Sequence, residues 1–344
     1  MITRARAWFA ARTTAATDWP AEELLVRKTS RPARVSVVIP ARNEEATIGA
    51  IVRRIRADLI DATGLVDELL VIDSDSTDAT AQVARRNGAQ VWAAADIRPE
   101  FGAYHGKGEA VWKSLFVATG DILVFLDGDL TEWGSHFVTG LVGPLLSDER
   151  VQLVKGFYDR QFAGDNGDAA EARPQGGRVT ELVARPLLNL KWPELAAVVQ
   201  PIGGEWGVRR ELLESLSIPV GYGLEMAVLL DTWQHYGLDA LAQVDLGIRR
   251  HRHQSVHDLG VMAAEIQHVA LLRLHADPAA HAVLHQFDRA VEGGWVARPV
   301  PVQERPPVTS VSERLGNASE HRTRASTEDS NQRPMSACAK RNPS

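Results

Sequence analysis

The sequence predicts an α/β protein with a doubly wound, mostly parallel sheet and helices on both of its faces. Short apolar runs of strand length recur from Val35 onward. Each is followed by a polar turn and then by a segment with apolar residues at helical spacing. Continuous apolar runs are typical of parallel strands, because helices bury both faces of such a sheet. In this architecture the ligand crevice lies at the carboxyl ends of the strands.

The first half of the chain contains four of these strand segments. Residues 35–39 form an apolar run that stops at Pro40, and residues 48–59 place apolar side chains on one face of a helix. Further strands are expected at 68–72, 90–93 and 121–126, with helices through 83–87 and at 109–118. The last strand leads directly into Asp127-Gly128-Asp129, which we therefore expect at the crevice.

The second half has a less regular pattern. We expect a strand at 151–158, a long loop at 159–177, helices at 178–190 and 225–236, a strand at 240–246 and a helix at 261–274. In the first of these helices Pro186 predicts a kink or restart. Its apolar side is expected to carry Val179, Leu182, Val183, Leu187 and Leu190.

Composition and charge exclude several classes of protein. The formal net charge of -6 argues against a nucleic-acid partner, because phosphate backbones require a basic face. Cys338 is the only cysteine, so neither an intrachain disulfide nor a cysteine metal site is expected, which favours the cytoplasm. Residues 1–14 lack the apolar run of a signal peptide, and no run of about 18 apolar residues predicts a membrane span.

Asp127 and Asp129 are the strongest candidates for a metal site. Two carboxylates at i and i+2 beyond a strand end can converge on one hard cation, and oxygen ligands suit Mg²⁺ or Mn²⁺. The alternative is a turn or helix cap, where Asp and Gly are common. Because four βα units precede this segment, we favour the metal site over the turn or cap.

A second group of candidates follows the strand at 240–246. His251 can supply an imidazole ligand, which accepts Mn²⁺ more readily than Mg²⁺. Arg249 and Arg252 can pair with phosphate oxygens. A solvated basic cluster is the alternative interpretation of this segment.

Glycine-rich and polar loops provide further candidate binding groups. Residues 40–44 follow the first strand and can face a base or ribose, although Asn43 and Glu44 also suit helix capping. Gly106-Lys107-Gly108 lacks the spacing of a P-loop, and no GxGxxG follows a predicted strand, which disfavours kinases and dehydrogenases. The helix start at 176–180 offers amides and Arg178 to an anion, or is a simple glycine hinge. Glu225, at a loop-to-helix junction, can bind a sugar hydroxyl or be an ordinary surface residue.

Eight motifs together resemble one known family. In order they are VSVVIPARNEE, LLVIDSDSTDAT, HGKGEAVWKSL, FLDGD, GGRVTELVARPLLNL, QPIGGEWGVRREL, GYGLEMAVLLD and IRRHRH. From Val35 to about Leu274 the chain resembles the actinobacterial glucosyl-3-phosphoglycerate synthases. The resemblance implies the GT-A fold and transfer of glucose, with retention, from UDP-glucose to 3-phosphoglycerate. It also implies a homodimer and a role in methylglucose lipopolysaccharide synthesis.

The resemblance assigns roles to individual residues. Asp127, Asp129, Glu225 and Arg249 become the catalytic group, with Asp129 and His251 as direct metal ligands, Glu225 on the glucose and Arg249 on the diphosphate. The nucleotide would be held by Pro40, Ala41, Arg42, Asn43, Glu44, Ser74, Lys107 and the segment Asp127, Gly128 and Asp129. The acceptor would be held by Gly177, Arg178, Val179, Thr180, Tyr222 and His253. Two positions depart from the family pattern, Gly128 for a serine and His253 for an asparagine.

The sequence pattern also predicts a division of the chain. Residues 1–34 are an N-terminal extension, 35–150 the nucleotide-sugar half, 151–298 the acceptor half with C-terminal helices, and 299–344 a disordered tail. Alternatives remain: mannosyl transfer to phosphoglycerate or glycerate, an inverting polyprenyl-phosphate or polysaccharide transferase, and a catalytically silent nucleotide-sugar sensor. The sensor is disfavoured because a protein that only binds has little need for Asp127 and Asp129 together with His251 and Glu225. The inverting enzymes are disfavoured because the chain lacks a QxxRW motif.

Overall fold

The computed structural model describes residues 3–162, 177–251, 255–275, 282–287, 291 and 295–311. The helices are α1 (Thr3–Arg12), α2 (Ala21–Ser30), α3 (Ile48–Ile55), α4 (Thr80–Arg86), α5 (Lys107–Ser114), α6 (His136–Ser147), α7 (Arg185–Lys191), α8 (Arg210–Ser215), α9 (Leu224–Tyr236) and α10 (Val256–Arg273). The strands are β1 (Thr13–Ala15), β2 (Val35–Ala41), β3 (Glu68–Asp73), β4 (Gln90–Ala93), β5 (Ile122–Phe125), β6 (Leu153–Phe162), β7 (Trp206–Arg209), β8 (Ile218–Pro219), β9 (Leu241–His251), β10 (Ala282–Phe287), β11 (Trp295–Val300) and β12 (Glu304–Arg305).

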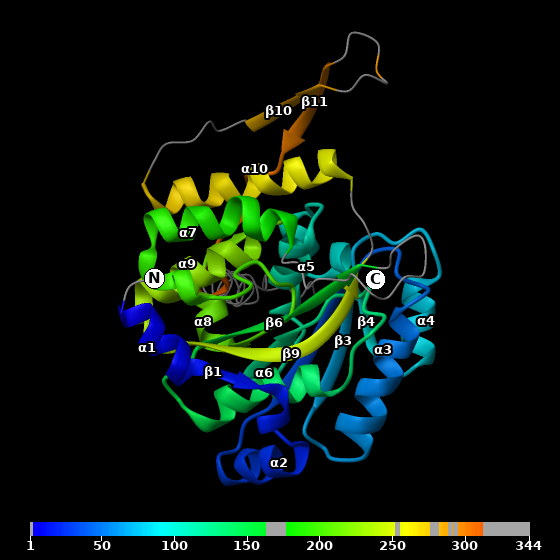
Figure 1. Ribbon diagram of the computed structural model, residues 1–344. Coiled ribbons are helices and arrows are strands. Elements are labelled where there is room, and N and C mark those ends of the chain that lie inside the picture. The colour runs from blue at the N-terminus through cyan, green and yellow to red at the C-terminus, as the bar shows by residue number, and fades with distance from the viewer. Residues whose placement is uncertain are drawn as a thin grey trace, which may run out of the picture.

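A central sheet of eight strands organises the molecule (Figure 1). Its order is β1-β9-β6-β7-β5-β2-β3-β4, and every neighbouring pair is parallel except the two that involve β7. The predicted doubly wound, mostly parallel sheet is therefore confirmed. Because β2, β3 and β5 run in the same direction, their carboxyl ends meet at one edge, where a ligand crevice is expected.

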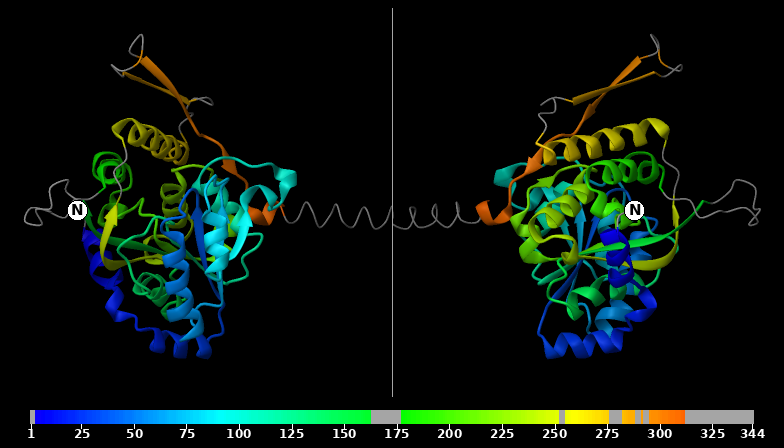
Figure 2. Two further views of the ribbon diagram at one scale, coloured as in Figure 1. Left: turned by 90° about the vertical axis from the view of Figure 1, so that its right-hand side faces the viewer. Right: turned by 60° about the vertical axis from the view of Figure 1, so that its left-hand side comes forward.

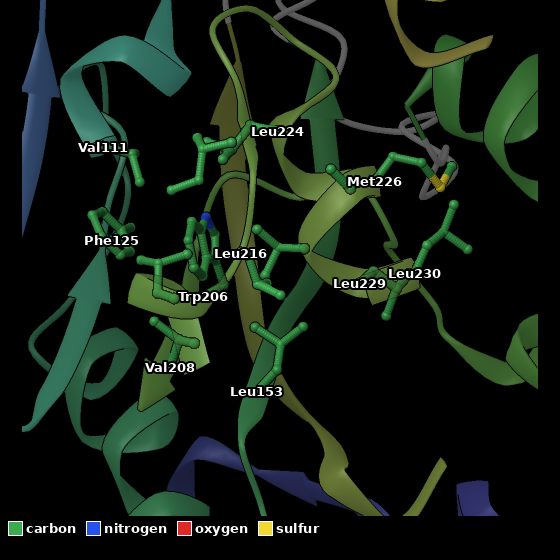
Figure 3. Packing of buried hydrophobic residues seen from close by; sticks show 14 of the residues in the cluster. Val111, Phe125, Leu153, Trp206, Val208, Leu216, Leu224, Met226, Leu229 and Leu230 are labelled. Carbon is green, nitrogen blue, oxygen red and sulfur yellow. The ribbon is translucent and has the colours of Figure 1, made fainter. Parts of the chain in front are cut away.

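Two buried apolar clusters, one on each face, hold the helices against this sheet. One cluster includes residues of α5, α7, α8, α9 and α10, and the other includes residues of α2, α3, α4 and α6. Figure 3 shows part of the first cluster, in which the rings of Phe125 and Trp206 stack at 4.4 Å. This stack joins β5 to β7, so the strand that leads into Asp127 is fixed by packing from its neighbour.

The N-terminal segment is part of this domain. β1 pairs in parallel with β9 at the sheet edge, and the Trp8 indole donates to the Leu241 carbonyl at 3.0 Å. Residues 3–34, which the sequence separated as an extension, thus complete the sheet, and α2 lies below it in Figure 1. No helix within the described ranges is long and apolar enough to cross a membrane.

The helix expected at 178–190 forms, but its buried face differs from the prediction. Residues Thr180–Ala184 form a π-helical turn before α7, with Pro186 in the first turn of α7. A π turn holds more residues than an α turn and shifts the apolar side that regular spacing predicts. Leu182 and Leu190 are consequently 76% and 78% exposed, whereas Leu188 is 1% exposed.

The C-terminal region is ordered further than the sequence indicated. α10 begins at Val256 rather than near 261, because the Ser255 side chain caps it by accepting from the Asp258 amide at 3.1 Å. Beyond it, β10 and β11 form a hairpin that projects from the body (Figure 2). Disorder from residue 299 is wrong for 299–311, because β12 pairs with β8 and Val308 and Val311 join the core. The rest of the predicted tail lies outside the described residues.

Two substitutions on α7 test the corrected face of this helix. Leu188→Ala should lower the free energy of unfolding by roughly 2–5 kcal/mol, because it leaves a cavity in the core. Leu190→Ala, two residues away and exposed, should change it by less than about 0.5 kcal/mol. Chemical denaturation of both variants measures the difference, and equal effects would contradict the π-shifted register.

Candidate functional site

A cavity of about 520 Å³ lies at the carboxyl ends of β2, β3 and β5. It is lined by Pro40, Ala41, Arg42, Glu44, Ser74, His105, Gly106, Lys107, Asp127, Gly128, Asp129, Gly221, Tyr222, Glu265 and Pro301. Most side chains that the sequence assigned to a nucleotide thus surround one space. The lining residues come from both halves of the chain, so only the tertiary structure brings them together.

Two loops at the sheet edge fix one wall of the cavity. Asn43 adopts a left-handed conformation with φ 58°, and its side-chain oxygen accepts from the Thr77 amide at 2.8 Å. The Glu44 amide donates to the Thr80 hydroxyl at 2.7 Å. Asn43 therefore joins the loop after β2 to the loop after β3, rather than capping α3, whose N-cap is Thr47.

The segment Asp127-Gly128-Asp129 follows β5 and is held by backbone contacts. The Thr47 hydroxyl donates to the Gly128 carbonyl at 2.7 Å. On the other side, Gly204 lies so close to Asp127 that a Cβ there would meet Asp127 Oδ2 at 2.4 Å. A side chain at position 204 would displace the carboxylate, so glycine is required at this approach.

Lys107 connects two of the predicted catalytic acids. Its Nζ lies 2.6 Å from Asp127 Oδ1 and 2.9 Å from Glu225 Oε1. Lys107 begins α5, and Glu225 is the second residue of α9, so these helix starts point their polar groups at the same space. One lysine thus bridges the two halves of the chain.

Arg249 makes the second bridge, from β9. Its Nη2 donates to Asp127 Oδ2 at 3.1 Å and to Asp129 Oδ1 at 2.8 Å. Its Nη1 donates to the Tyr158 hydroxyl at 2.8 Å and pairs with the wholly buried Glu205. The Arg249 side chain is only 2% exposed, and its carboxylate partners offset part of the lost hydration, while its Nε has no hydrogen-bond partner among the described atoms.

The ion pairs around Asp127 favour the charged forms of Lys107 and Asp127. Burial alone would lower the pKa of Lys107, but Asp127 and Glu225 outweigh it and raise that pKa. Burial would raise the pKa of Asp127, yet Lys107 and Arg249 hold it well below its usual range. Burial lowers the pKa of Lys155, whose Nζ donates to the Gly203 carbonyl at 2.7 Å, to about 8.

The donor set fits a hard divalent cation. Two carboxylates, Asp127 and Asp129, line the cavity, and oxygen ligands suit Mg²⁺ and Mn²⁺. Among the described residues, Asp127, Asp129, Glu205 and Glu225 pair with two cations, Lys107 and Arg249, and a divalent ion would offset the excess negative charge of this group. The part of the chain that the structure describes contains no cluster of three His, Cys, Asp or Glu side chains that holds a metal by itself.

Several predicted residues lie elsewhere or outside the description. Val179 and Thr180 are buried, with Val179 in the core cluster beneath α10, and the segment 177–180 does not appear among the described residues that line the cavity. His251 is the last residue of β9, two positions after Arg249, and its side chain is outside the description. His253 lies outside the described residues. Tyr222 does line the cavity, with its side chain partly exposed.

Comparison with known proteins supports the interpretation of this site. Residues 36–216 match the model of the glycosyl transferase family 2. The chain is 43% identical over 311 residues to a glucosyl-3-phosphoglycerate synthase of Mycolicibacterium paratuberculosis, covering 89% of this chain and 93% of that protein. It is 45% identical over 253 residues to the enzyme of the same name from Petrotoga mobilis, covering 74% and 77% of the two chains.

A solved structure extends the similarity to three dimensions. The glucosyl-3-phosphoglycerate synthase of Mycobacterium tuberculosis, in complex with Mn²⁺, UDP-glucose and phosphoglyceric acid, has 43% identity and a TM-score of 0.77. The similarity covers 87% of this chain and 98% of that one. This chain belongs to the glucosyl-3-phosphoglycerate synthases. The resemblance drawn from the eight motifs is thereby confirmed, as is the GT-A fold.

Reasoning from the sequence missed several residues around the site of this family member. Glu205, Tyr158 and Lys155 surround Arg249 or the Gly203-Gly204 turn, and Glu265 and Pro301 line the cavity from the C-terminal region. An acid directly after two glycines was the available signal for Glu205, within a motif that was already noticed. The other residues lie in segments with ordinary strand, helix or tail patterns, and such patterns do not predict which distant residues a side chain contacts.

Glu265 leads to a prediction on the pH dependence of stability. Burial raises the pKa of Glu265 to about 7, although its Oε2 accepts from the Tyr222 amide at 2.6 Å. The unfolded carboxyl loses its proton near 4.5, so the folded state loses relative stability as pH rises from about 4.5 to about 7. Glu265→Gln removes this loss and should stabilise the chain at pH 8 more than at pH 4.5.

Denaturant midpoints at the two pH values measure this effect. Glu211→Gln, at an exposed position of α8, is the control and should shift neither midpoint. An equal shift for Glu265→Gln at both pH values would show that the carboxyl does not titrate in this range.

Proposed function

We propose that this chain transfers glucose from UDP-glucose to 3-phosphoglycerate and gives glucosyl-3-phosphoglycerate. The observation that supports this most is the cavity lined by Lys107, Asp127 and Asp129, whose charges pair with the buried Arg249 and Glu225 behind it. The similar enzyme of Mycobacterium tuberculosis binds UDP-glucose and phosphoglyceric acid together with Mn²⁺. Because this chain belongs to the same family and its site has this pattern of charges, we propose the same substrates for it.

The donor is proposed to bind along the sheet edge. Pro40, Ala41, Arg42, Asn43, Glu44 and Ser74 would hold the uridine, and Lys107 with Asp127, Gly128 and Asp129 would face the diphosphate. Asn43 acts through the loops that it joins, since it fixes the positions of residues 41–44. When the glucosyl bond breaks, negative charge grows on the diphosphate, and Lys107 and Arg249 are placed to stabilise it.

We propose Mg²⁺ or Mn²⁺ as the cofactor, held by Asp129 and His251. The bound ion would act as a Lewis acid toward the diphosphate oxygens. Asp127 contacts Lys107 and Arg249 directly, which supports a role for it in positioning these cations. The acceptor is proposed to bind Gly177, Arg178, Val179, Thr180, Tyr222 and His253, where a helix start offers free amides to its phosphate.

Retention of configuration is proposed to proceed by attack on the same face of the sugar. The Glu225 carboxylate pairs with Lys107 at 2.9 Å, which supports a role in orienting the sugar and the lysine rather than in forming a covalent bond. In this mechanism a donor phosphate oxygen accepts the proton of the acceptor hydroxyl as the glucosyl bond breaks. A glucosyl adduct trapped on Glu225 would overturn it.

A coupled assay tests the proposed reaction. UDP release from UDP-glucose and Mn²⁺ should depend on 3-phosphoglycerate, and mass spectrometry should find glucosyl-3-phosphoglycerate. Mannose nucleotides and glycerate serve as alternative substrates, and preference for either would select a mannosyl or glycerate transferase. Release of UDP at the same rate without any acceptor would rule out the proposed transfer.

Asp129→Ala is expected to abolish metal-dependent turnover, a loss of about 100-fold or more, because it removes a carboxylate that faces the cavity. The thermal midpoint should change little, since Asp129 is partly exposed. Asp239→Ala removes an exposed aspartate on another part of the surface and should keep full activity. Retained activity in Asp129→Ala would refute the metal assignment.

We also propose that the enzyme is cytoplasmic, serves methylglucose lipopolysaccharide synthesis and forms a homodimer through the projecting hairpin. The hairpin exposes Val283, Phe287 and Trp295 by 50%, 54% and 63%, and a projecting apolar surface of this kind favours a protein partner. Sedimentation should show a dimer that Phe287→Ser with Trp295→Ser dissociates. A parent chain that sediments as a monomer would refute this assembly.

A further inference from the structure

The segment after β11 passes directly along the donor side of the cavity. Pro301 lines the cavity, and β12 pairs with β8 through Glu304↔Pro219 and Arg305↔Ile218. The Val220 amide donates to the Gln303 carbonyl at 3.1 Å, just before the loop that carries Tyr222. A segment that the sequence assigned to a tail therefore forms part of the wall of the site.

Arg305 anchors this segment inside the protein. Its Nε and Nη2 donate to the two carboxylate oxygens of Glu109 at 2.7 and 2.6 Å, and both residues are buried. Its guanidinium also donates to the carbonyls of Phe101 and Gly102, at 2.9 and 3.2 Å. Tyr104 and Trp112 place their rings 4.4 and 4.8 Å from the guanidinium carbon.

Glu109 lies in the first turn of α5, two residues after Lys107. This first turn of α5 packs directly against the backbone of Pro219 and Val220, at the end of β8, which we call the β8 loop. A Cβ on Gly108 would lie 1.7 Å from the Pro219 carbonyl oxygen, and one on Gly106 would lie 2.2 Å from that of Val220. The Glu109 amide donates to the Val220 carbonyl at 3.2 Å. A shift of the β8 loop therefore moves the start of α5.

We propose that Arg305 is a positioning residue of the donor site. By joining Glu109 to β12 it fixes the start of α5, so that Lys107 stays between Asp127 and Glu225, and it fixes the loop that carries Tyr222. Arg305 does not line the cavity, so its effect on the site must pass through Glu109 and the backbone. This inference rests on the proposed function, because it gives Arg305 an effect on the UDP-glucose site.

The effect should appear in donor binding more than in overall stability. Arg305→Met leaves Glu109 buried without its cation, and the carboxylate must then seek water or another partner. Either response moves the first turn of α5 and with it the Lys107 ammonium. The displaced ammonium would lose its charge-assisted contact with the diphosphate, so we expect a rise of about tenfold in the KM for UDP-glucose.

Arg210→Met provides a matched control at the other end of α5. Arg210 donates to the carbonyls of Gly120, Leu115 and Ala118, at 2.6, 3.1 and 2.6 Å, and is partly buried. Its loss should lower the thermal midpoint but leave Lys107 in place. The KM for UDP-glucose should therefore remain that of the parent.

The experiment compares Arg305→Met, Arg305→Lys and Arg210→Met in the full chain. Steady-state kinetics gives KM for each substrate, and calorimetry gives the Kd of UDP with Mn²⁺. Arg305→Met should weaken UDP and UDP-glucose binding about tenfold with a smaller change in the KM for 3-phosphoglycerate. Arg305→Lys keeps the charge and should restore part of the binding.

Unchanged UDP binding in folded Arg305→Met would overturn the inference, and so would equal weakening in Arg210→Met. If Arg305→Met does not fold, Arg305→Lys and Glu109→Gln decide by the same comparison. A parent chain that binds UDP but does not turn over UDP-glucose would count against the proposed function alone. The UDP affinities of the variants would then still report on Arg305.

Discussion

The carboxylate of Asp127 is the group on which the site depends. Lys107 contacts one of its oxygens and Arg249 the other, and each of these cations also holds a second acid, Glu225 or Glu205. Charges removed from water cost several kcal/mol each unless they are paired. Asp127 lets four elements, α5, α9, β9 and the segment after β5, bring charged groups into one space with both Lys107 and Arg249 paired.

The fold supplies the positions that this charge network requires. Parallel strands place the loops after β2, β3 and β5 at one edge, and the antiparallel β7 brings Gly204 and Glu205 beside Asp127 from the second half of the chain. The stacked rings of Phe125 and Trp206 fix these two strands from within the core. The same packing that stabilises the sheet therefore determines where the charged side chains meet.

The C-terminal segment adds a second level of support. Its buried ion pair between Arg305 and Glu109 joins the end of the described chain to the helix that carries Lys107. Arginine suits this position because its planar group can bond both carboxylate oxygens while aromatic rings cover its faces. A contact between residues more than 190 positions apart in sequence thus stabilises the wall of one cavity.

The sequence by itself determined the parallel sheet, the loops of the donor side and Asp127 with Asp129, because short apolar strands and the polar turns after them are local patterns. The eight motifs also identified the family. Tertiary structure alone decided that Glu205, Glu265 and Arg305 lie around the site, since contacts between distant elements leave no periodic signal. It also decided which leucines of the helix before α7 and of α7 are buried, because one π turn shifts the spacing on which the prediction relied.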